Sequence, residues 1–323
     1  MTLFIDERAV AELIAMPDAL VAVREGFEAM ARGNVENLPR TRLGHGEGTV
    51  RITAALAAER GYFAVKISSR AVFESNSGRI LNLFELSTGK LCAVIQVFGL
   101  GALRTAAVSG VATDLLARPD ADVLAVIGTG RQARRQLEAM LHVRTIKQVR
   151  VFGRDPHRRA DFAAFPRAKS IETIECTDVE QAVAGASVVV TATSARDPVL
   201  FGVWLDPGVH VNAIGANDVS RRELDSEVVA RADIVVVDEP LQAPLEASDL
   251  IQPVAEGIIS WEQVKGLDEI LAGSPGRQTA GDITLFKSMG TAVGDAMLAA
   301  LVYERALQSG VGISLPDLSG TLP

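Results

Sequence analysis

The sequence predicts an α/β protein in which a doubly wound domain with a parallel sheet is joined to a smaller α+β domain. Two observations support this prediction. In the middle of the chain, short apolar, β-branched segments alternate with helical ones, and a glycine-rich turn follows the first of them. The first 120 residues instead contain strands linked by tight turns. We expect residues 121–290 to form the doubly wound domain, and residues 1–120 with 291–323 to form the smaller one.

The smaller domain is expected to begin with a helix and continue as a sheet. Pro17 is a favourable first-turn residue and Gly33 a stop signal, so the helix should lie between them. Ser87–Lys90 has the composition of a hairpin turn, and Ala102–Ala117 predicts a second helix. Strands are expected at the segments with alternating or clustered apolar residues, namely Gly48–Ala55, Tyr62–Ile67, Ile80–Leu86 and Leu91–Val97.

Asp122–Arg154 has the pattern of a strand, a glycine turn, a helix and a second strand. Gly128, Gly130 and Ala133 form the motif G-x-G-x-x-A. The first glycine permits the turn, the second lets the backbone approach a pyrophosphate, and the alanine allows close helix–strand packing. The N–H groups at the helix start then favour phosphates. This is the Rossmann arrangement for a dinucleotide, and a glycine-bearing turn without a ligand is the alternative.

The end of the second strand indicates which dinucleotide binds. An NAD site usually has an Asp or Glu there for the ribose hydroxyls, but this chain has Gly153 and Arg154. A guanidinium can pair with a 2′-phosphate, so we expect NADP(H) to be favoured over NAD(H). Asp155 would restore NAD binding if the register shifted by one residue, and Arg154 could instead be a solvated turn residue. The residues expected to contact the cofactor are Thr105, Gly128, Thr129, Gly130, Arg131, Gln132, Gly153, Arg154, Thr193 and Gly215.

The alternation of strands and helices continues after the glycine motif. Asp178–Ala184 predicts a helix. With the first two strands, six strands are expected in a parallel sheet covered on both faces. Thr291–Leu307 predicts a long helix that returns to the smaller domain, and the substrate should bind between the domains near the carboxyl ends of the parallel strands. The further four strands are predicted at Ser170–Cys176, Ser187–Thr193, Val209–Ile214 and Ile234–Asp238.

Composition excludes several classes of function. A net charge of −8 argues against a nucleic-acid partner, which needs clustered Lys and Arg. No apolar run near 20 residues and no signal peptide is present, so we expect a cytoplasmic protein without a membrane partner. Cys92 and Cys176 lack the spacing of a zinc site or a disulfide framework, and the four histidines are scattered, so no metal site is expected.

Several short motifs together resemble the ornithine cyclodeaminase/mu-crystallin family, in the family's order and over nearly the whole chain. They are Pro39-Arg40, Val65-Lys66-Ile67, Ala102-Leu103-Arg104-Thr105-Ala106-Ala107, Gly128-Thr129-Gly130-Arg131-Gln132-Ala133, Val211-Asn212-Ala213-Ile214-Gly215, Glu223-Leu224-Asp225 and Leu285-Phe286-Lys287-Ser288. The resemblance implies a homodimer that binds a nicotinamide cofactor and an α-amino or α-imino acid. It also implies that the smaller domain binds substrate and mediates dimerisation.

The resemblance further implies that Arg40, Lys66 and Arg104 hold the substrate carboxylate. Physical chemistry supports two of these assignments. Lys66 lies in an apolar strand, where a lone ammonium is costly unless an anion pairs with it. Arg104 lies near the predicted start of a helix, so it and the helix dipole could share one anion. For each residue the alternative is a structural salt bridge. Thr105 could add a hydrogen bond to a phosphate or carboxylate.

Two positions depart from the cyclodeaminase pattern. Asn217 stands where the family's cyclodeaminases have a catalytic aspartate, and an amide can orient a substrate but cannot exchange a proton. Asp218 could replace that base only if the loop shifted by one residue. Arg51 replaces an acidic residue that would receive the side-chain amine of ornithine, so an uncharged or acidic substrate side chain is preferred. Asn217 could instead be a turn residue, and Arg51 an outward-facing strand residue.

We therefore expect an NAD(P)H-dependent oxidoreductase that reduces the C=N bond of an α-imino acid, such as Δ1-pyrroline-2-carboxylate, or a related amino-acid dehydrogenase. The substrate would be held by Arg40, Arg51, Lys66 and Arg104, and catalysis would use Lys66, Arg104 and Asn217. Two alternatives stay open. One is an ornithine cyclodeaminase with Asp218 as the base. The other is a non-catalytic, NADPH-dependent binder of small molecules that resembles mu-crystallin.

Overall fold

The computed structural model describes residues 2–45, 48–70 and 78–316. The chain divides into two compact units: unit 1 comprises Met1–Arg104 and Thr291–Pro323, and unit 2 comprises Thr105–Gly290. The later boundary of unit 2 follows Gly290. The earlier boundary between the compact units lies between Arg104 and Thr105, inside a helix, and the domain boundary expected after residue 120 stays a prediction. A helix that is continuous across a boundary leaves no change in composition for sequence analysis to detect.

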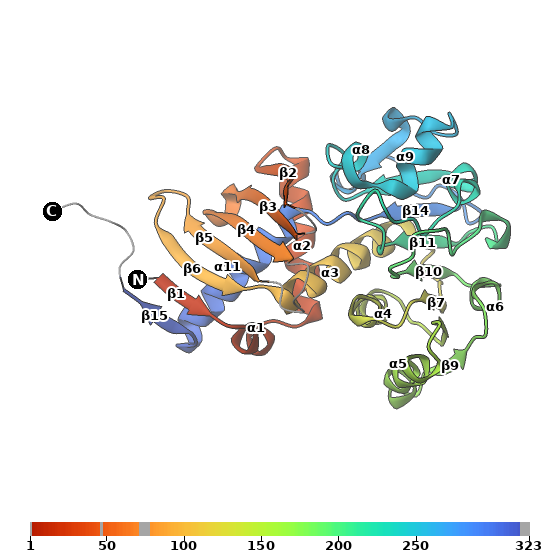
Figure 1. Ribbon diagram of the computed structural model, residues 1–323, viewed down its shortest axis with the longest axis horizontal. Helices are drawn as coiled ribbons and strands as arrows, with labels where there is room; N and C mark the ends of the chain where they lie inside the picture. Colours follow the sequence, from red (N-terminus) through yellow and green to blue (C-terminus); the bar gives the residue numbers. More distant parts are fainter. Residues whose placement is uncertain (1, 46–47, 71–77, 317–323) are drawn as a thin grey trace. The chain divides into compact units, whose positions relative to one another are not determined.

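Unit 1 is built on a seven-stranded sheet in the order β15-β1-β6-β5-β4-β3-β2 (Figure 1). All neighbouring pairs are antiparallel except β1 and β6. The four predicted strands are confirmed, as is the turn between β5 and β6, whereas β1, β2 and β15 were not predicted. The strands are β1 (Thr2–Ile5), β2 (Val35–His45), β3 (Gly48–Ala57), β4 (Tyr62–Arg70), β5 (Arg79–Glu85), β6 (Leu91–Gln96) and β15 (Ile313–Leu315).

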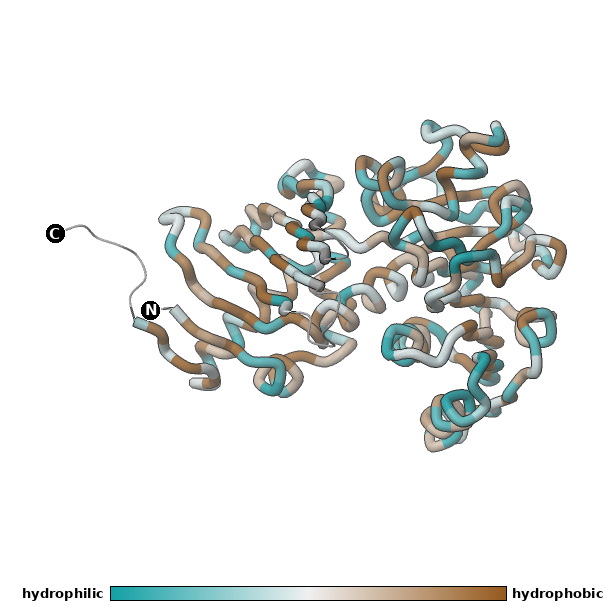
Figure 2. Tube along the Cα trace, in the orientation of Figure 1, coloured by the Kyte–Doolittle hydropathy of each residue, from teal (hydrophilic) through white to brown (hydrophobic). Residues whose placement is uncertain are grey.

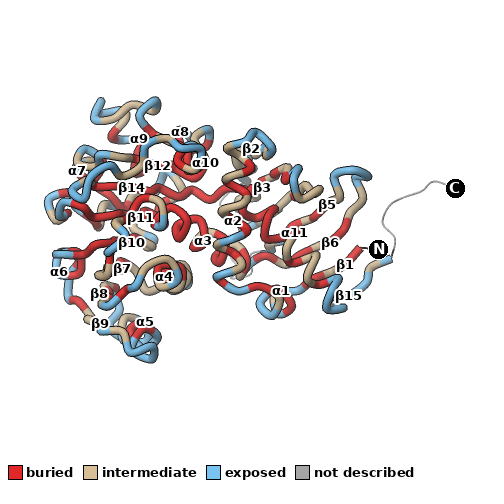
Figure 3. The backbone as a smooth tube through the Cα atoms, turned by 180° about the vertical axis from the view of Figure 1, so that it is seen from behind, coloured by how far each residue is buried: buried red, intermediate tan, exposed pale blue. Residues whose placement is uncertain are grey.

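Helices cover one face of this sheet. Helix α11 (Ala292–Ser309) is buried along most of its length and packs on β3, β4 and helix α2 (Met16–Ala31) (Figure 3). Pro17 lies in the first turn of α2, and Gly33 beyond its end has a φ of 74°, as the sequence predicted. Helix α1 (Glu7–Leu13) and the start of helix α3 (Phe98–Leu116) complete the unit, with the short turn η1 (Ala58–Arg60). The helix expected to return at residue 291 is therefore confirmed as α11.

Unit 2 contains an eight-stranded sheet whose neighbours are all parallel, in the order β13-β12-β14-β11-β10-β7-β8-β9. The six predicted strands are confirmed, and β13 and β14 were missed. Strands β7, β10 and β12 are nearly continuous apolar runs, as expected in a sheet buried on both faces, and Figure 2 colours the chain by hydropathy. The strands are β7 (Val123–Ile127), β8 (Gln148–Phe152), β9 (Glu172–Glu175), β10 (Val188–Thr191), β11 (His210–Ala213), β12 (Ile234–Val237), β13 (Val264–Gly266) and β14 (Thr284–Lys287).

Helices lie on both faces of the unit 2 sheet, which confirms the doubly wound fold class. On one face, Asn212 of β11 donates to Thr113 of α3 at 2.9 Å. On the other, apolar residues of β10 and β11 join those of α6, α7 and α9 in one core. Among the described residues no helix could span a membrane. The remaining elements are α4 (Arg131–Val143), α5 (Pro156–Ala168), α6 (Val179–Val183), α7 (Ser226–Arg231), α8 (Ala243–Glu246), α9 (Ser248–Ala255), α10 (Leu267–Leu271), η2 (Gly202–Trp204) and η3 (Trp261–Gln263).

Candidate active site

Three charged side chains meet in the interior of unit 1. The carboxylate of Asp295 accepts from Lys66 Nζ through Oδ2 and from Arg104 Nε through Oδ1, the latter at 3.0 Å. Asp295 is 1% exposed and Arg104 is 5% exposed. Buried charges are tolerated only when they are paired, and here one carboxylate pairs with two cations. We call Lys66, Arg104 and Asp295 the cation cluster, because its net charge is positive.

Local structure explains how these residues meet. Lys66 lies opposite Thr53 and Leu81, both buried, and therefore points to the face of the sheet that α11 covers. Asp295 lies in the first turn of α11, where the helix dipole favours a carboxylate. Its neighbour Gly294 allows the close approach, since a Cβ there would lie 2.8 Å from Arg104 Cγ.

Burial and the neighbouring charges shift the pKa values of Lys66 and Asp295. Burial lowers the pKa of Lys66 to about 8, with Asp295 opposing the shift and the positive charges of Arg104 and Arg40 adding to it. Burial alone would raise the pKa of Asp295, but Arg104 and Lys66 together hold it below its usual value. Arg104 Nη1 is also buried, and it has no hydrogen-bond partner in the described part of the chain. A carboxylate ligand could supply that partner.

One sequence-based expectation about Arg104 is wrong. Helix α3 begins at Phe98, not at Ala102, so Arg104 lies inside the helix. The N–H groups of Phe98 and Gly99 donate to the carboxylate of Glu7, which occupies the helix start. The helix dipole therefore does not assist Arg104. Asp295 was missed altogether, although a single acidic residue within the apolar first turns of a predicted buried helix was a usable signal.

The other two cations expected to bind substrate are also in unit 1. Arg40 follows Pro39 where the pairing of β2 with β3 is irregular, between Leu38 and Thr41. Proline cannot donate to a strand ladder, which accounts for an irregularity at this point. Arg51 lies across from Ser68, two residues along β4 from Lys66, so both side chains project from the same face of the sheet. Their roles in binding stay predictions.

Carboxylate binding should weaken as the pH rises through about 8, the pKa of Lys66. Lys66 is charged below that value and neutral above it, so the dissociation constant of a carboxylate ligand should increase by up to about tenfold per pH unit. The inhibition constant of pyrrole-2-carboxylate, whose own charge is constant over this range, would measure the effect. A Lys66→Arg variant, which stays charged, should show no such dependence. A pH-independent constant in the unmodified protein would contradict the assignment.

The glycine turn of unit 2 has the geometry that a pyrophosphate requires. Gly128 has a φ of 119°, and a Cβ there would lie 2.5 Å from the carbonyl oxygen of Ala192, so no other residue fits. Gly130 precedes α4 without a side-chain cap, and nothing lies within 4 Å of where its Cβ would be. Gln132 Nε2 is buried and has no partner within the described ranges. These residues fit a dinucleotide phosphate bound at the helix start.

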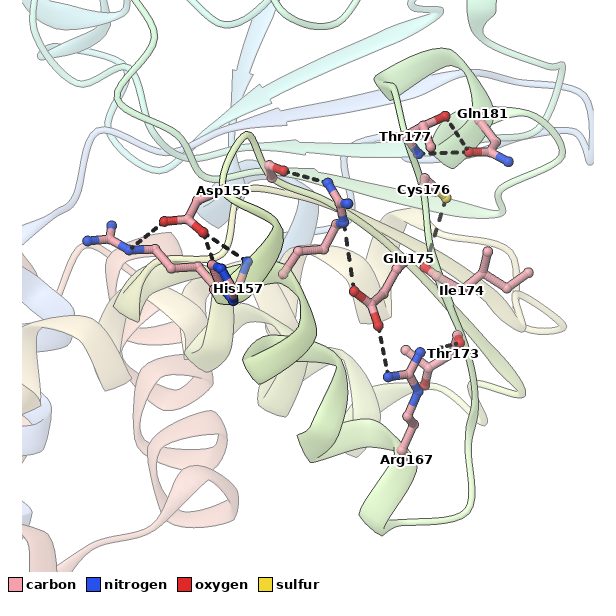
Figure 4. A network of polar contacts seen from close by, with 12 residues as sticks. Asp155, His157, Arg167, Thr173, Ile174, Glu175, Cys176, Thr177 and Gln181 are labelled. Atoms are coloured by element: carbon pink, nitrogen blue, oxygen red, sulfur yellow. Dashed lines mark hydrogen bonds and ion pairs between the residues drawn. The ribbon is translucent and has the colours of Figure 1, made fainter.

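The end of β8 is followed by a glycine, an exposed arginine and an aspartate that caps a helix. Gly153 packs against Thr129, since a Cβ at Gly153 would lie 2.7 Å from Thr129 Cγ2. Arg154 is exposed. Asp155 caps helix α5 by accepting from the N–H groups of His157 at 2.9 Å and Arg158 at 3.2 Å (Figure 4). Because its carboxylate is engaged as a helix cap, Asp155 is a poor candidate for the ribose ligand.

The segments after β10 and β11 contain four of the predicted residues, Thr193, Gly215, Asn217 and Asp218. The N–H groups of Thr193 and Gly215 both donate to Glu223 at 2.6 Å, so these residues could touch a cofactor only through other atoms. Asn217 and Asp218 are half-buried in the loop after β11. Asp218 Oδ1 accepts from the N–H and hydroxyl groups of Ser220, which speaks against a role as base.

The other two predicted contacts lie on helices. Thr105 is in α3, and Arg131 is the first residue of α4. No group of three or more His, Cys, Asp or Glu residues suited to a metal occurs in the described part of the chain.

Comparison with known proteins agrees with this architecture. A model of the ornithine cyclodeaminase/mu-crystallin family matches residues 1–310. The chain belongs to this family. Among curated members, it is 39% identical over 236 residues to Δ1-pyrroline-2-carboxylate reductase from Bacillus cereus, covering 72% of each chain. It is 33% identical to alanine dehydrogenase from Archaeoglobus fulgidus, covering 96% of this chain and 97% of that one.

A solved member of the family has the same fold throughout. The structure of Δ1-pyrroline-2-carboxylate reductase from Thermococcus litoralis in complex with NADH and L-proline superimposes with a TM-score of 0.92 at 32% identity. The match covers 97% of this chain and all of that one. The family expected from the sequence is therefore confirmed, and the expected class of enzyme, an NAD(P)-dependent oxidoreductase acting on C–N bonds, agrees with these relatives.

Proposed function

We propose that the chain is an NAD(P)H-dependent reductase of an α-imino acid, with a cyclic ketimine such as Δ1-pyrroline-2-carboxylate as the substrate class. The cation cluster carries this proposal. Arg104 Nη1 is buried without a partner among the described residues, and Lys66 and Arg104 are already oriented by Asp295. A substrate carboxylate would meet preorganised donors, so the two side chains would lose little conformational entropy when it binds. Reductases of this class are among the family members described above.

The residues divide the work as follows. A bound nicotinamide supplies the hydride. Lys66 and Arg104 hold the substrate carboxylate, and Lys66, with a pKa of about 8, can keep a proton near the substrate at neutral pH. Asn217 orients the substrate without exchanging a proton. Imine reduction needs no carboxylate base on the loop after β11, whereas cyclodeamination does, and one oxygen of Asp218 already accepts two hydrogen bonds from Ser220.

A panel of substrates tests the proposal. Oxidation of NADPH and NADH would be followed at 340 nm with Δ1-pyrroline-2-carboxylate, Δ1-piperideine-2-carboxylate and imines formed from 2-oxo acids and an amine. Conversion of L-ornithine to proline consumes no net reduced cofactor, so it would be followed by proline formation with NAD(P)+. We expect rapid NAD(P)H oxidation with at least one imino acid and no proline from ornithine. Ornithine turnover to proline without imine reduction would assign a cyclodeaminase. NADPH binding without turnover of any imine would assign a non-catalytic binder.

We also propose that NADP(H) is favoured over NAD(H). Arg154 is exposed at the end of β8, where its guanidinium can pair with a 2′-phosphate, and Asp155 directs its carboxylate to the backbone N–H groups that begin α5. The relative from Thermococcus litoralis was solved with NADH, so the preference depends on this local feature of the present chain.

Replacing Arg154 by serine should reduce the preference for NADPH. Loss of one charge-assisted pair predicts a KM for NADPH about tenfold higher, with little change for NADH. Arg158→Ser, in which a neighbouring exposed arginine is removed, serves as the control. Equal effects on both cofactors, or no effect on either, would contradict the assignment of Arg154.

A homodimer is the proposed assembly, formed through the face of the unit 1 sheet opposite α11. That face is largely apolar and only partly buried in the single chain. Phe63 and Phe84 stack on it with ring centroids 4.7 Å apart, and Ile52, Ile67 and Ile80 lie alongside. A broad apolar face of this kind suits a two-fold interface. Sedimentation velocity would distinguish a dimer from a monomer.

A further inference from the structure

Glu223 is a fully buried carboxylate that joins two separate segments of unit 2. Oε1 accepts from the N–H of Thr193 at 2.6 Å, and Oε2 accepts from the N–H of Gly215 at 2.6 Å and from Thr191 Oγ1 at 2.9 Å. Thr191 ends β10, and Gly215 follows β11 by two residues. One side chain therefore fixes the chain as it leaves two adjacent parallel strands.

A second buried carboxylate, that of Asp249, fixes the backbone at Glu223. Asp249, on α9, accepts from the backbone N–H groups of Glu223 at 2.7 Å and Leu224 at 3.0 Å. Its other oxygen lies 2.8 Å from Lys287 Nζ, a charge contact between two side chains with no exposed surface. Lys287 belongs to β14, one of the strands that the sequence did not predict. Two carboxylates and one ammonium are thus buried together, at a cost that a purely structural role could avoid with apolar residues.

The charges of Asp249 and Lys287 shift the pKa of Glu223 in opposite directions. Burial raises the pKa of Glu223, Asp249 adds to the shift, and Lys287 counters it. Three donors converge on the two carboxylate oxygens, which is a set that an ionised carboxylate satisfies in full and an amide cannot. Glu223 is therefore suited to hold these donors only while it is charged.

The segments that Glu223 holds are those to which the sequence assigned cofactor and catalytic residues. Thr193 and Gly215 were predicted to contact the cofactor, and Asn217 is two residues beyond Gly215. We propose that Glu223 is a positioning residue, which aligns the ends of β10 and β11 so that Gly215 and Asn217 take their working positions against the nicotinamide. This inference rests on the proposed function, since it assigns Glu223 to the same reaction.

A Glu223→Gln variant tests the proposal. The carboxamide has the shape of the carboxylate, but one of its oxygens is replaced by an NH2 group. The backbone N–H of either Thr193 or Gly215 therefore loses its acceptor. Hydrogen exchange in the protein without cofactor should show faster exchange at Thr193 or Gly215. The dissociation constant of NADPH, from its fluorescence, should rise about tenfold, and turnover at saturating NADPH should fall at least about tenfold, with a larger deuterium isotope effect from 4-deuterated NADPH.

Two further variants serve as comparisons. Glu227→Gln removes an exposed carboxylate of helix α7 and should match the unmodified protein in every measurement. Glu223→Asp keeps the charge on a shorter side chain and should recover part of the loss. Thermal unfolding of each variant establishes the folded fraction, and all rates are compared per folded molecule.

The outcomes separate a positioning role from a merely structural one. If Glu223→Gln lowers only the melting temperature, while NADPH binding, turnover and the isotope effect are unchanged, the proposal is wrong. If the unmodified protein binds NADPH but reduces no imino acid, the proposed function fails. In that case hydrogen exchange and NADPH fluorescence still decide whether Glu223 positions the segments that follow β10 and β11.

Discussion

Replacing Arg104 by methionine should lower kcat/KM for the imino acid by about a thousandfold. Arg104 is buried, it pairs with Asp295 at 3.0 Å, and its Nη1 has no other partner in the described part of the chain. Removing one member of a buried, hydrogen-bonded charge pair costs about 2–5 kcal/mol, and 4 kcal/mol corresponds to about a thousandfold. Steady-state kinetics with the imino acid identified by the substrate panel would measure the loss.

Two comparisons make this result specific. Arg60→Met removes a partly buried arginine of unit 1, paired with Glu25 and Glu304, and should leave kcat/KM within about threefold. Arg104→Lys should restore only part of the activity, because an ammonium lacks the guanidinium fork. If Arg104→Met stays within tenfold of the unmodified protein, after correction for its folded fraction, Arg104 serves folding alone.

Alanine at the two glycines of the turn should produce opposite patterns. At Gly128, a Cβ would meet the Ala192 carbonyl oxygen at 2.5 Å and the φ of 119° disfavours any side chain, so Gly128→Ala should destabilise unit 2 by about 2 kcal/mol or more. At Gly130 the backbone is extended and the space is open, so Gly130→Ala should change stability by no more than about 1 kcal/mol. The same methyl group would stand where a pyrophosphate approaches, and NADPH should bind at least about tenfold more weakly.

Denaturant unfolding and NADPH fluorescence, applied to both variants, would check this pair. The expected outcome is a stable Gly130→Ala protein with weak cofactor binding beside a destabilised Gly128→Ala protein. Unaltered NADPH affinity in a folded Gly130→Ala protein would show that the pyrophosphate binds elsewhere.

Much of the fold was predictable because its signals are local. A few consecutive residues are enough to predict each of these features: the glycine motif, the apolar runs of β10 and β11, and the alternating strands of unit 1. The missed elements have no such signal. Strand β14 has four residues, and it becomes a strand because it lies between β11 and β12, which only the tertiary structure decides. Strand β1 is equally short and depends on pairing with β6 and β15.

The candidate site was predictable in its cations but not in its carboxylates. Lys66 is a charge within an apolar strand, and its largely buried side chain pairs with Asp295, in agreement with that reasoning. Asp295 and Glu223 are each separated from their partners in the chain, by 229 residues in the case of Asp295 and Lys66. No spacing rule links such residues, so their contacts follow only from packing. The expectation that Arg104 and the dipole of α3 would share an anion was wrong for a similar reason. Glu7, which is distant in sequence, caps the start of that helix.

The position of α11 in the chain bears on how the protein forms during synthesis. Lys66 and Arg104 leave the ribosome long before Asp295, and all of unit 2 is translated in between. Unit 2 is one continuous segment and can fold as soon as it emerges. The amino-terminal strands must wait for the last helix, because until α11 docks they have neither their core partner nor a counter-ion for two buried cations. Unit 1 is thus the first part of the chain to be synthesised and the last to complete its fold.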